Sequence, residues 1–192
     1  MARRAHPPQR AKVVLVSGAS LRGGEAEIAH LQDIYPDAAV LRGADATVEH
    51  CLGAIDGATL VHFASHGVFR ADNPMFSSLS MYDGPLTVHD LGRLRHAPYR
   101  IIMSACDSGR GSPAGSQELL GLQTALISLG TASIASTVSE VNDAATTGFT
   151  LALHRELAAG RSLPSAVCTA QSPASDSHLA RATAASFVAF GA

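Results

Sequence analysis

Two residues that could do chemistry together, a histidine and a cysteine, each follow a short run suited to a buried strand. His66 and Gly67 come after residues 60–64, and Cys106 comes after residues 100–104. If these strands are parallel neighbours, their carboxyl ends meet at one edge of the sheet, where open α/β sheets place ligand crevices. A thiolate is a nucleophile, and a nearby imidazole can take its proton or stabilise its charge. The pattern therefore favours a thiol nucleophile with a histidine partner.

Each residue of this group also has a purely structural interpretation. A lone cysteine after an apolar strand is commonly a core thiol. However, residues 107–115 after Cys106 are rich in Gly and Ser, and a core thiol does not require such a loop after it. His66 can be a turn histidine bonded to a backbone carbonyl. Gly67 is either a turn residue or, because it lacks a Cβ, a place where a substrate carbonyl approaches a backbone N–H in an oxyanion hole. Spacing alone leaves these alternatives open.

Metal, dinucleotide and serine-hydrolase chemistry are disfavoured by spacing. His62 and His66 are four residues apart, a step of roughly 13 Å along a strand, so they should not share a metal ion, and His62 is expected to be a satisfied core side chain. The other histidines show no ligand spacing. Pro113 interrupts the glycines at 109–115, so neither a dinucleotide loop nor a Gly-x-Ser-x-Gly elbow is formed. We expect no metal and no cofactor.

Composition predicts one globular domain without an affinity for nucleic acid. The 192 residues are 46% hydrophobic and 16% charged, with a net charge of -2, which is enough for a core and too balanced for a nucleic-acid footprint. No apolar run has the length of a signal or membrane-spanning segment, so a soluble protein that is not exported is expected. Three widely spaced cysteines predict no disulfide framework and suit the cytoplasm.

The chain alternates strand-like and helix-like segments from its first apolar run onward. Because helices separate the strands, the sheet is expected to be mostly parallel with right-handed crossovers. The expected strands are 12–17, 38–41, 59–64, 100–104 and 132–138, and the expected helices are 23–35, 47–55, 117–129, a segment capped at 142 or 143 that reaches 159, and 163–171.

A different pattern separates the third and fourth strands. Residues 79–88 read as a small hairpin around Asp83-Gly84, a favoured turn dipeptide. Thr87 can cap a short helix that extends through Leu94.

The ends of the chain lack strong periodicity. Residues 1–10 are expected to be disordered because they have little apolar surface to bury, which leaves 11–192 as the domain. Residues 172–185 are expected to be loop-like. Residues 186–190 form either a sixth strand or a packed tail.

The two strand ends resemble the CHAT family, caspase-like domains often associated with tetratricopeptide repeats, in the group of cysteine peptidases that includes caspases, legumain, gingipains and separase. The family's signatures are a His-Gly after one strand and an Ala-Cys after the next, and the likeness extends over roughly residues 12–190. The resemblance implies a caspase-like three-layer α/β/α sandwich with a mostly parallel central sheet and a small accessory hairpin. It rests on residues 61–67, Asn73-Pro74, 78–84, Leu86-Thr87, Asp90-Leu91, 104–106, Gly121-Leu122, 141–143 and Ala145-Thr146.

The same resemblance implies a reaction and roles for the two strand-end residues. Cys106 would be the nucleophile, His66 the base or acid, and the backbone N–H groups of Gly67 and Cys106 the oxyanion donors. The implied reaction is peptide-bond hydrolysis through a thioester acyl-enzyme, in which His66 protonates the departing amine.

Substrate-binding residues are also implied. Ser136, Thr137, Val138 and Ser139 resemble the segment that pairs with the substrate backbone in caspases. Many family members have Leu-Trp where this chain has Val138-Ser139, which leaves a more open wall. Asp107 would either bias a pocket toward a basic residue or be a loop anion.

Partners follow from the family as well. A protein or peptide substrate is expected, with a regulatory sensor or a repeat-containing partner, and with neither nucleic acid nor a membrane. The alternative function is a catalytically silent caspase-like module that binds proteins through the same crevice.

Overall fold

The computed structural model describes residues 11–19, 21, 23–68, 70, 72–104, 123–137, 143–172 and 177–191. The expected disorder at 1–10 and the Gly- and Ser-rich segment 107–115 lie outside these residues. Within the described part of the chain, no helix is long and apolar enough to cross a membrane.

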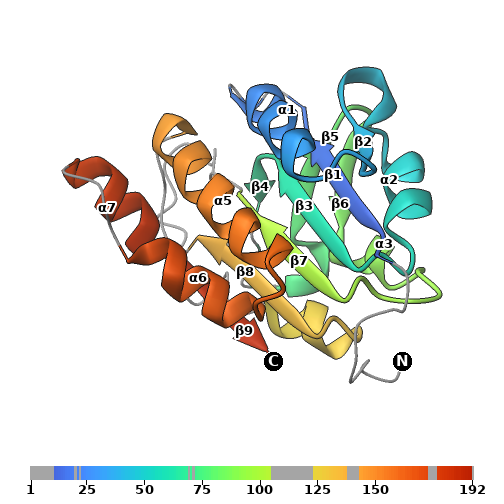
Figure 1. Cartoon of the computed structure of the whole chain (residues 1–192). Coiled ribbons are helices and arrows are strands. Elements are labelled where there is room, and N and C mark those ends of the chain that lie inside the picture. Colours follow the sequence, from blue (N-terminus) through green and yellow to red (C-terminus); the bar gives the residue numbers. More distant parts are fainter. Residues whose placement is uncertain are drawn as a thin grey trace.

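A six-stranded sheet in the order β2-β1-β3-β7-β8-β9 forms the middle layer of the described chain (Figure 1). The first five strands are parallel, and the last pairs antiparallel with β8. The expected parallel sheet is confirmed, and the alternative of a sixth strand at the C-terminus is the one realised. The strands are β1 (Val13–Ser17), β2 (Ala39–Leu41), β3 (Leu60–Ala64), β7 (Arg100–Met103), β8 (Ser133–Thr137) and β9 (Phe187–Gly191).

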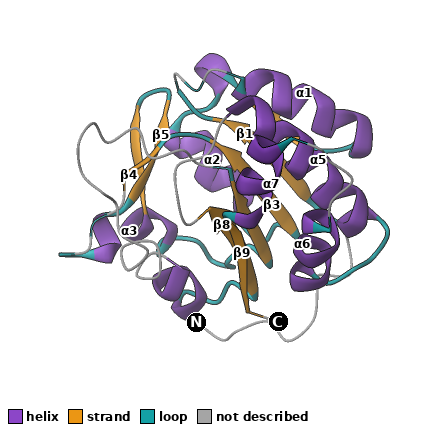
Figure 2. Ribbon diagram, turned by 90° about the vertical axis from the view of Figure 1, so that its left-hand side faces the viewer, coloured by secondary structure: helices purple, strands orange, loops and turns teal. Residues whose placement is uncertain are grey.

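Helices cover both faces of this sheet, which gives three layers (Figure 2). On one side lie α1 (Gly24–Ile34), α5 (Asp143–Ala158) and α6 (Leu163–Gln171), with α7 (His178–Ala185) packed on α5 and α6. On the other side lie α2 (Val48–Ile55), α3 (Val88–Leu91) and a helical segment at 123–128. The three-layer α/β/α sandwich expected from the sequence is therefore present.

Side-chain alternation along β3 assigns its residues to the two faces. Val61 and Phe63 belong to the core cluster on the α2 side, whereas Leu60 and Ala64 belong to clusters on the α1 and α5 side. Successive side chains of a strand point to opposite faces, so His62 lies on the α1 and α5 side. This placement decides which polar groups it can meet.

The accessory element is a three-stranded antiparallel sheet rather than a hairpin alone. Its strands are β4 (Gly67–Val68), β5 (Ser78–Met81) and β6 (Gly84–Thr87). The two-residue turn falls on Tyr82 and Asp83, one position earlier than expected, because Met81 pairs with Gly84. Thr87 caps α3 as expected, in a reciprocal capping box with Asp90, and the helix ends at Leu91 rather than at Leu94.

The loop expected at 172–185 is wrong over its second half, where α7 forms. The side chain of Ser177 accepts a hydrogen bond from the Ala180 N–H at 3.3 Å and caps the helix. Alanine, the strongest helix former, occupies half of the positions in α7. The Ser- and Asp-rich composition of the wider segment obscured this local signal.

Candidate functional site

The carboxyl ends of β3 and β7 lie side by side, as the sequence predicts for the strands that precede His66 and Cys106. The two strands are parallel neighbours, and Phe63 pairs with Met103. His66 and Cys106 each stand three positions after one of these paired residues in the sequence. Cys106 itself lies outside the described residues, as do Asp107, Val138 and Ser139.

His66 occupies the junction between the central sheet and the accessory sheet. It is half-buried, and its carbonyl oxygen accepts a hydrogen bond from the Ser80 N–H at 2.8 Å. The Ser65 hydroxyl donates to the Ser80 carbonyl at 2.8 Å and also lies 3.2 Å from the His66 carbonyl. The backbone at His66 is thus fixed by β5. Gly67 is not a turn residue, because it begins β4 opposite Leu79.

Ser136 and Thr137 are buried in the sheet. They are 2% and 7% exposed, and Ser136 accepts a hydrogen bond from the Gln123 side chain. Ser136 has register partners on both sides, Met103 in β7 and Val188 in β9. Both sides of Ser136 are therefore taken by neighbouring strands, and Val138 and Ser139 lie outside the described residues.

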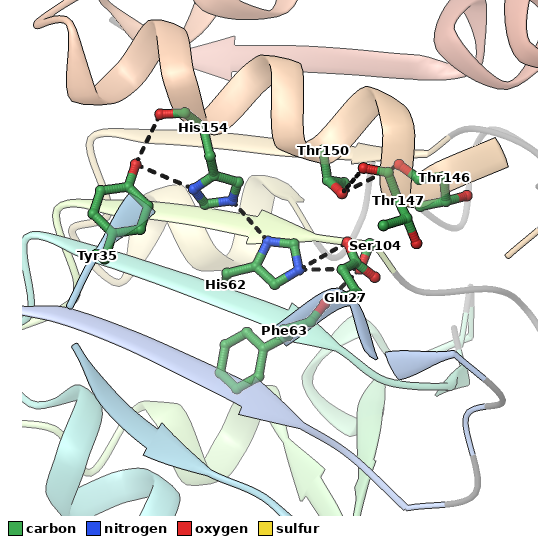
Figure 3. A network of polar contacts seen from close by, with 9 residues as sticks. All are labelled: Glu27, Tyr35, His62, Phe63, Ser104, Thr146, Thr147, Thr150 and His154. Carbon is green, nitrogen blue, oxygen red and sulfur yellow. Dashed lines mark hydrogen bonds and ion pairs between the residues drawn. The ribbon is translucent and has the colours of Figure 1, made fainter. Parts of the chain in front are cut away.

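A buried polar cluster that the sequence pattern did not indicate lies near these strand ends (Figure 3). It centres on Glu27 of α1, which is 3% exposed, and includes His62 and Ser104, which are 0% and 4% exposed. Glu27 Oε1 lies 3.2 Å from His62 Nε2. The Ser104 hydroxyl donates to Glu27 Oε2 at 3.2 Å and lies 3.3 Å from His62 Nε2. One carboxylate thus contacts side chains next to two neighbouring strand ends.

His154 of α5 extends this cluster across the helical layer. Its Nε2 lies 3.0 Å from His62 Nδ1, and its Nδ1 lies 3.2 Å from the Tyr35 hydroxyl. Burial, together with the charge of His62, holds the pKa of His154 well below 6.5, so His154 is neutral at pH 7. Burial also raises the pKa of Tyr35, so its hydroxyl keeps its proton.

Glu27 is ionised despite its burial. Burial acts to raise its pKa, but a hydrogen bond and the charge of His62, with hydrogen bonds from Thr150 and Ser104, outweigh that effect and place the pKa below 4.5. A buried carboxylate normally requires such compensation. The Glu27 carboxylate is therefore a fixed negative charge held by donors from the sheet and from α5.

The donors and acceptors of the cluster can be matched in two ways. In the first, the Tyr35 hydroxyl donates to His154, the Nε2–H of His154 donates to His62, and the Nε2–H of His62 faces Glu27. In the second, His62 carries one more proton, and its Nδ1–H donates to Nε2 of His154. The Nδ1–H of His154 then donates to the Tyr35 hydroxyl, which in turn donates to the His154 carbonyl at 3.0 Å. Both leave an N–H of His62 facing the carboxylate.

The two described thiols, Cys51 and Cys168, lie on helices. Cys51 is buried on α2 with its Sγ 3.5 Å from the Met81 sulfur. Burial, with the nearby charge of Asp83, raises its pKa to about 12, so it carries almost no thiolate. Cys168 is exposed on α6.

The expectation that His62 is a satisfied core histidine is confirmed by its contacts with Glu27 and His154.

The described part of the strand ends holds no cluster of metal-binding side chains. No group of three or more His, Cys, Asp or Glu residues in the described ranges is arranged to hold a metal ion. A surface cavity of about 470 Å³ lies between α5, α6 and α7, and none of its lining residues belongs to β3 or β7.

Solved structures with this arrangement of strands and helices cover most of the chain at low sequence identity. A separase–securin complex from Saccharomyces cerevisiae matches with a TM-score of 0.65 at 14% identity, over 94% of this chain and 12% of that chain. The Arg-specific cysteine proteinase gingipain R (RgpB) matches with a TM-score of 0.59 at 13% identity, over 94% of this chain and 46% of that chain. The complex of the Porphyromonas gingivalis RgpB pro- and mature domains gives 0.57 at 12% identity, over 94% and 47%.

These likenesses, with the layered sheet, define a caspase-like α/β fold. The family model of the CHAT domain matches residues 4–192, and the chain belongs to the CHAT family. The chain spans less than half the length of the structural neighbours reported above. Among curated proteins, none matches the chain significantly.

Proposed function

We propose that the chain is a cysteine endopeptidase that cleaves protein substrates with His66 and Cys106 through a thioester acyl-enzyme. The observation that carries the proposal is the register of β3 and β7, in which Phe63 and Met103 are paired three positions before the proposed base and nucleophile. Parallel strands direct both following segments to the same edge of the sheet. The caspase-like fold and membership of the CHAT family support the same assignment.

The proposed reaction uses a thiolate, an imidazole and backbone donors. The Cys106 thiolate attacks the substrate carbonyl carbon and forms a tetrahedral intermediate. Its oxyanion accepts hydrogen bonds from the backbone N–H groups of Gly67 and Cys106. His66 then protonates the departing amine, and water hydrolyses the thioester to restore the thiol.

Substrate contacts are proposed at 136–139 and at Asp107. Burial of the Ser136 and Thr137 side chains supports a proposal in which Val138 and Ser139 make the direct side-chain contacts. Asp107, next to the nucleophile in the sequence, would favour a basic substrate side chain through charge.

Labelling with a peptide electrophile tests the proposal. A peptidyl acyloxymethyl ketone series that varies the residue next to the warhead should label Cys106 in the native chain, as read by mass spectrometry. Labelling should be lost in Cys106→Ala, reduced at least 100-fold in His66→Ala, and unchanged in Cys168→Ala, which removes an exposed thiol. Failure of every member of the series to label Cys106 in the folded native chain would overturn it.

A silent interaction module is the rival proposal within the same fold. A peptide-library cleavage profile separates the two, because a module without activity gives the same profile for the native chain and for Cys106→Ala. Regulation by a sensor or repeat-containing partner is proposed for either case. Two of the structural neighbours are complexes, one with securin and one with a pro-domain.

A further inference from the structure

We propose that Glu27 is a positioning residue that clamps β3, through His62, to the carboxyl end of β7, through Ser104, and so sets the geometry of the segments that carry His66 and Cys106. This inference rests on the proposed function for its catalytic meaning. The clamp itself is a property of the described residues. It assigns a role to an acidic side chain that belongs to neither strand.

The two carboxylate oxygens of Glu27 contact different side chains, those of His62 and Ser104. Oε1 faces the His62 ring on β3, and Oε2 accepts the Ser104 hydroxyl directly after β7, both at 3.2 Å. Because the carboxylate is planar and rigid, a shift of either strand end breaks one of the two contacts. The 3.3 Å approach of Ser104 to His62 closes the triangle.

A buried ionic cluster is poor at adding stability, because desolvation offsets most of its Coulombic attraction. Apolar side chains of similar volume would fill the same space at no greater cost. The property that the cluster supplies and an apolar core lacks is directional contact, which fixes one relative position of the strands.

The clamp lies only a few residues from the proposed catalytic pair along the chain. Ser104 stands two positions before Cys106, and His62, within β3, stands four positions before His66 in the sequence. The backbone between the clamp and the proposed catalytic pair is short on both strands. The Ser104 N–H also donates to the Phe63 carbonyl at 3.0 Å, so the clamped side chains and this last inter-strand hydrogen bond act on the same pair of strands.

His154 holds the clamp from the opposite side of the His62 ring. Its Nε2 contacts His62 Nδ1 at 3.0 Å, and its own second nitrogen is engaged by Tyr35. With both nitrogens occupied, the His62 ring cannot rotate without losing a hydrogen bond in the interior. The ring is therefore a fixed donor toward Glu27.

Amide hydrogen exchange of Glu27→Gln tests the clamp without requiring activity. The variant keeps the side-chain volume and removes the charge. We expect exchange to accelerate at least tenfold at two strand-end amides, that of Ser104 after β7 and that of Ser80, which donates to the His66 carbonyl after β3. The mid-strand amides of Leu15 in β1 and Ala135 in β8 should stay within twofold. Glu25→Gln, on the exposed side of the same helix, should leave all four unchanged. Acceleration of all four amides by one common factor, or of none, would overturn the proposal.

A second variant covers the case in which Glu27→Gln does not fold. Ser104→Ala removes only the β7 arm and leaves the contact between Glu27 and His62. Its strand-end amides should respond in the same direction by at least threefold. Ile28→Val, a variant of a buried core residue, is the control for a general loss of stability. It should accelerate exchange of the strand-end and mid-strand amides by the same factor.

The reactivity of the thiols tests whether the clamp positions the proposed nucleophile. Iodoacetamide alkylation of Cys106, divided by that of the exposed Cys168 in the same molecule, should fall at least fivefold in Glu27→Gln and Ser104→Ala but not in Glu25→Gln. An unchanged ratio would refute a positioning role. If native Cys106 reacts no faster than Cys168, the peptidase proposal fails, while the exchange data still decide whether Glu27 clamps the strands.

Discussion

His154 shows how burial converts one side chain into a pH-dependent contribution to stability. Its pKa in the folded chain lies well below 6.5, because burial and the charge of His62 disfavour its protonation. The unfolded chain therefore binds one more proton at this residue, and stability falls as the pH drops below about 6.5. Glu27 acts in the same direction below about 4.5, because its folded pKa is depressed.

The variant His154→Gln should remove the first part of this acid sensitivity. Between about pH 6.5 and 5, its unfolding free energy should fall less steeply than that of the native chain, by up to about 1.4 kcal/mol per pH unit. At pH 7.5 it should be less stable by about 1–3 kcal/mol, because buried hydrogen bonds are lost. Urea titrations at several pH values measure both, with exposed His30→Gln as the control. Equal slopes in all three proteins would contradict the assignment.

Cys51 should be inert in the folded chain. Its pKa of about 12 and its complete burial leave neither thiolate nor access. Iodoacetamide at pH 8 should modify it at least 100-fold more slowly than Cys168, and both should react fully in denaturant. Mass spectrometry of the peptides measures the rates, and comparable reaction of the two thiols in the native chain would show that α2 does not seal Cys51.

At the scale of elements, the accessory sheet is attached to the central sheet at a crowded junction. The Gly18 N–H donates to the Ala64 carbonyl at 2.8 Å, and the next amide, of Ala19, donates to the Ser80 carbonyl at 3.0 Å. A Cβ on Gly18 would overlap the Ser65 hydroxyl and the Ser80 carbonyl. Glycine at this position lets β1, β3 and β5 meet behind His66.

Gly18→Ala should therefore force β5 away from the end of β3. Overpacking of this kind costs about 1–3 kcal/mol, and peptide-electrophile labelling of Cys106 should fall with it, because Ser80 fixes the His66 carbonyl. Gly53→Ala, in α2, is the matched control, since its Cβ meets no atom. The control should be neutral or stabilising by up to about 1 kcal/mol. Equal denaturation midpoints for the two variants would contradict the crowding argument.

For the whole molecule, the second core cluster joins the C-terminal strand to the helical layer. Phe187 of β9 stacks on Phe149 of α5 with ring centroids 4.2 Å apart, and Phe187 is 1% exposed. The antiparallel strand thus belongs to the same core as the parallel sheet. Loss of the packing of β9 should therefore destabilise the whole domain.

Phe187→Ala should lower the free energy of unfolding by about 3–5 kcal/mol, through lost burial and a residual cavity. That is a large share of the 5–15 kcal/mol typical of a domain. Urea denaturation followed by circular dichroism measures it. Leu179→Ala, at a residue 53% exposed on α7, should change stability by less than about 0.5 kcal/mol. A loss below about 1 kcal/mol for Phe187→Ala would show that β9 is not part of the cooperative unit.

The hydrophobic pattern predicted the parallel sheet from the sequence alone, because short apolar runs, such as those in β1 and β7, alternate with helix-like segments, and strands separated by helices pair in parallel. It also placed Gly67 and the proposed base at one strand end, since a strand must end where such a run ends. The prediction from local composition was wrong at α7, because the short Ala-rich stretch that forms this helix follows a Ser-rich segment.

Only the tertiary structure decided that Glu27, His62, Ser104 and His154 share one buried cluster. In the sequence, Glu27 and His154 look like ordinary polar positions on amphipathic helices, and periodicity states which face of a helix is apolar but not which strand that face meets. The partners are 35 to 92 residues apart along the chain, so their meeting depends on the strand order and on the packing of α1 beside α5. A charge can remain inside the protein only where that packing supplies its donors.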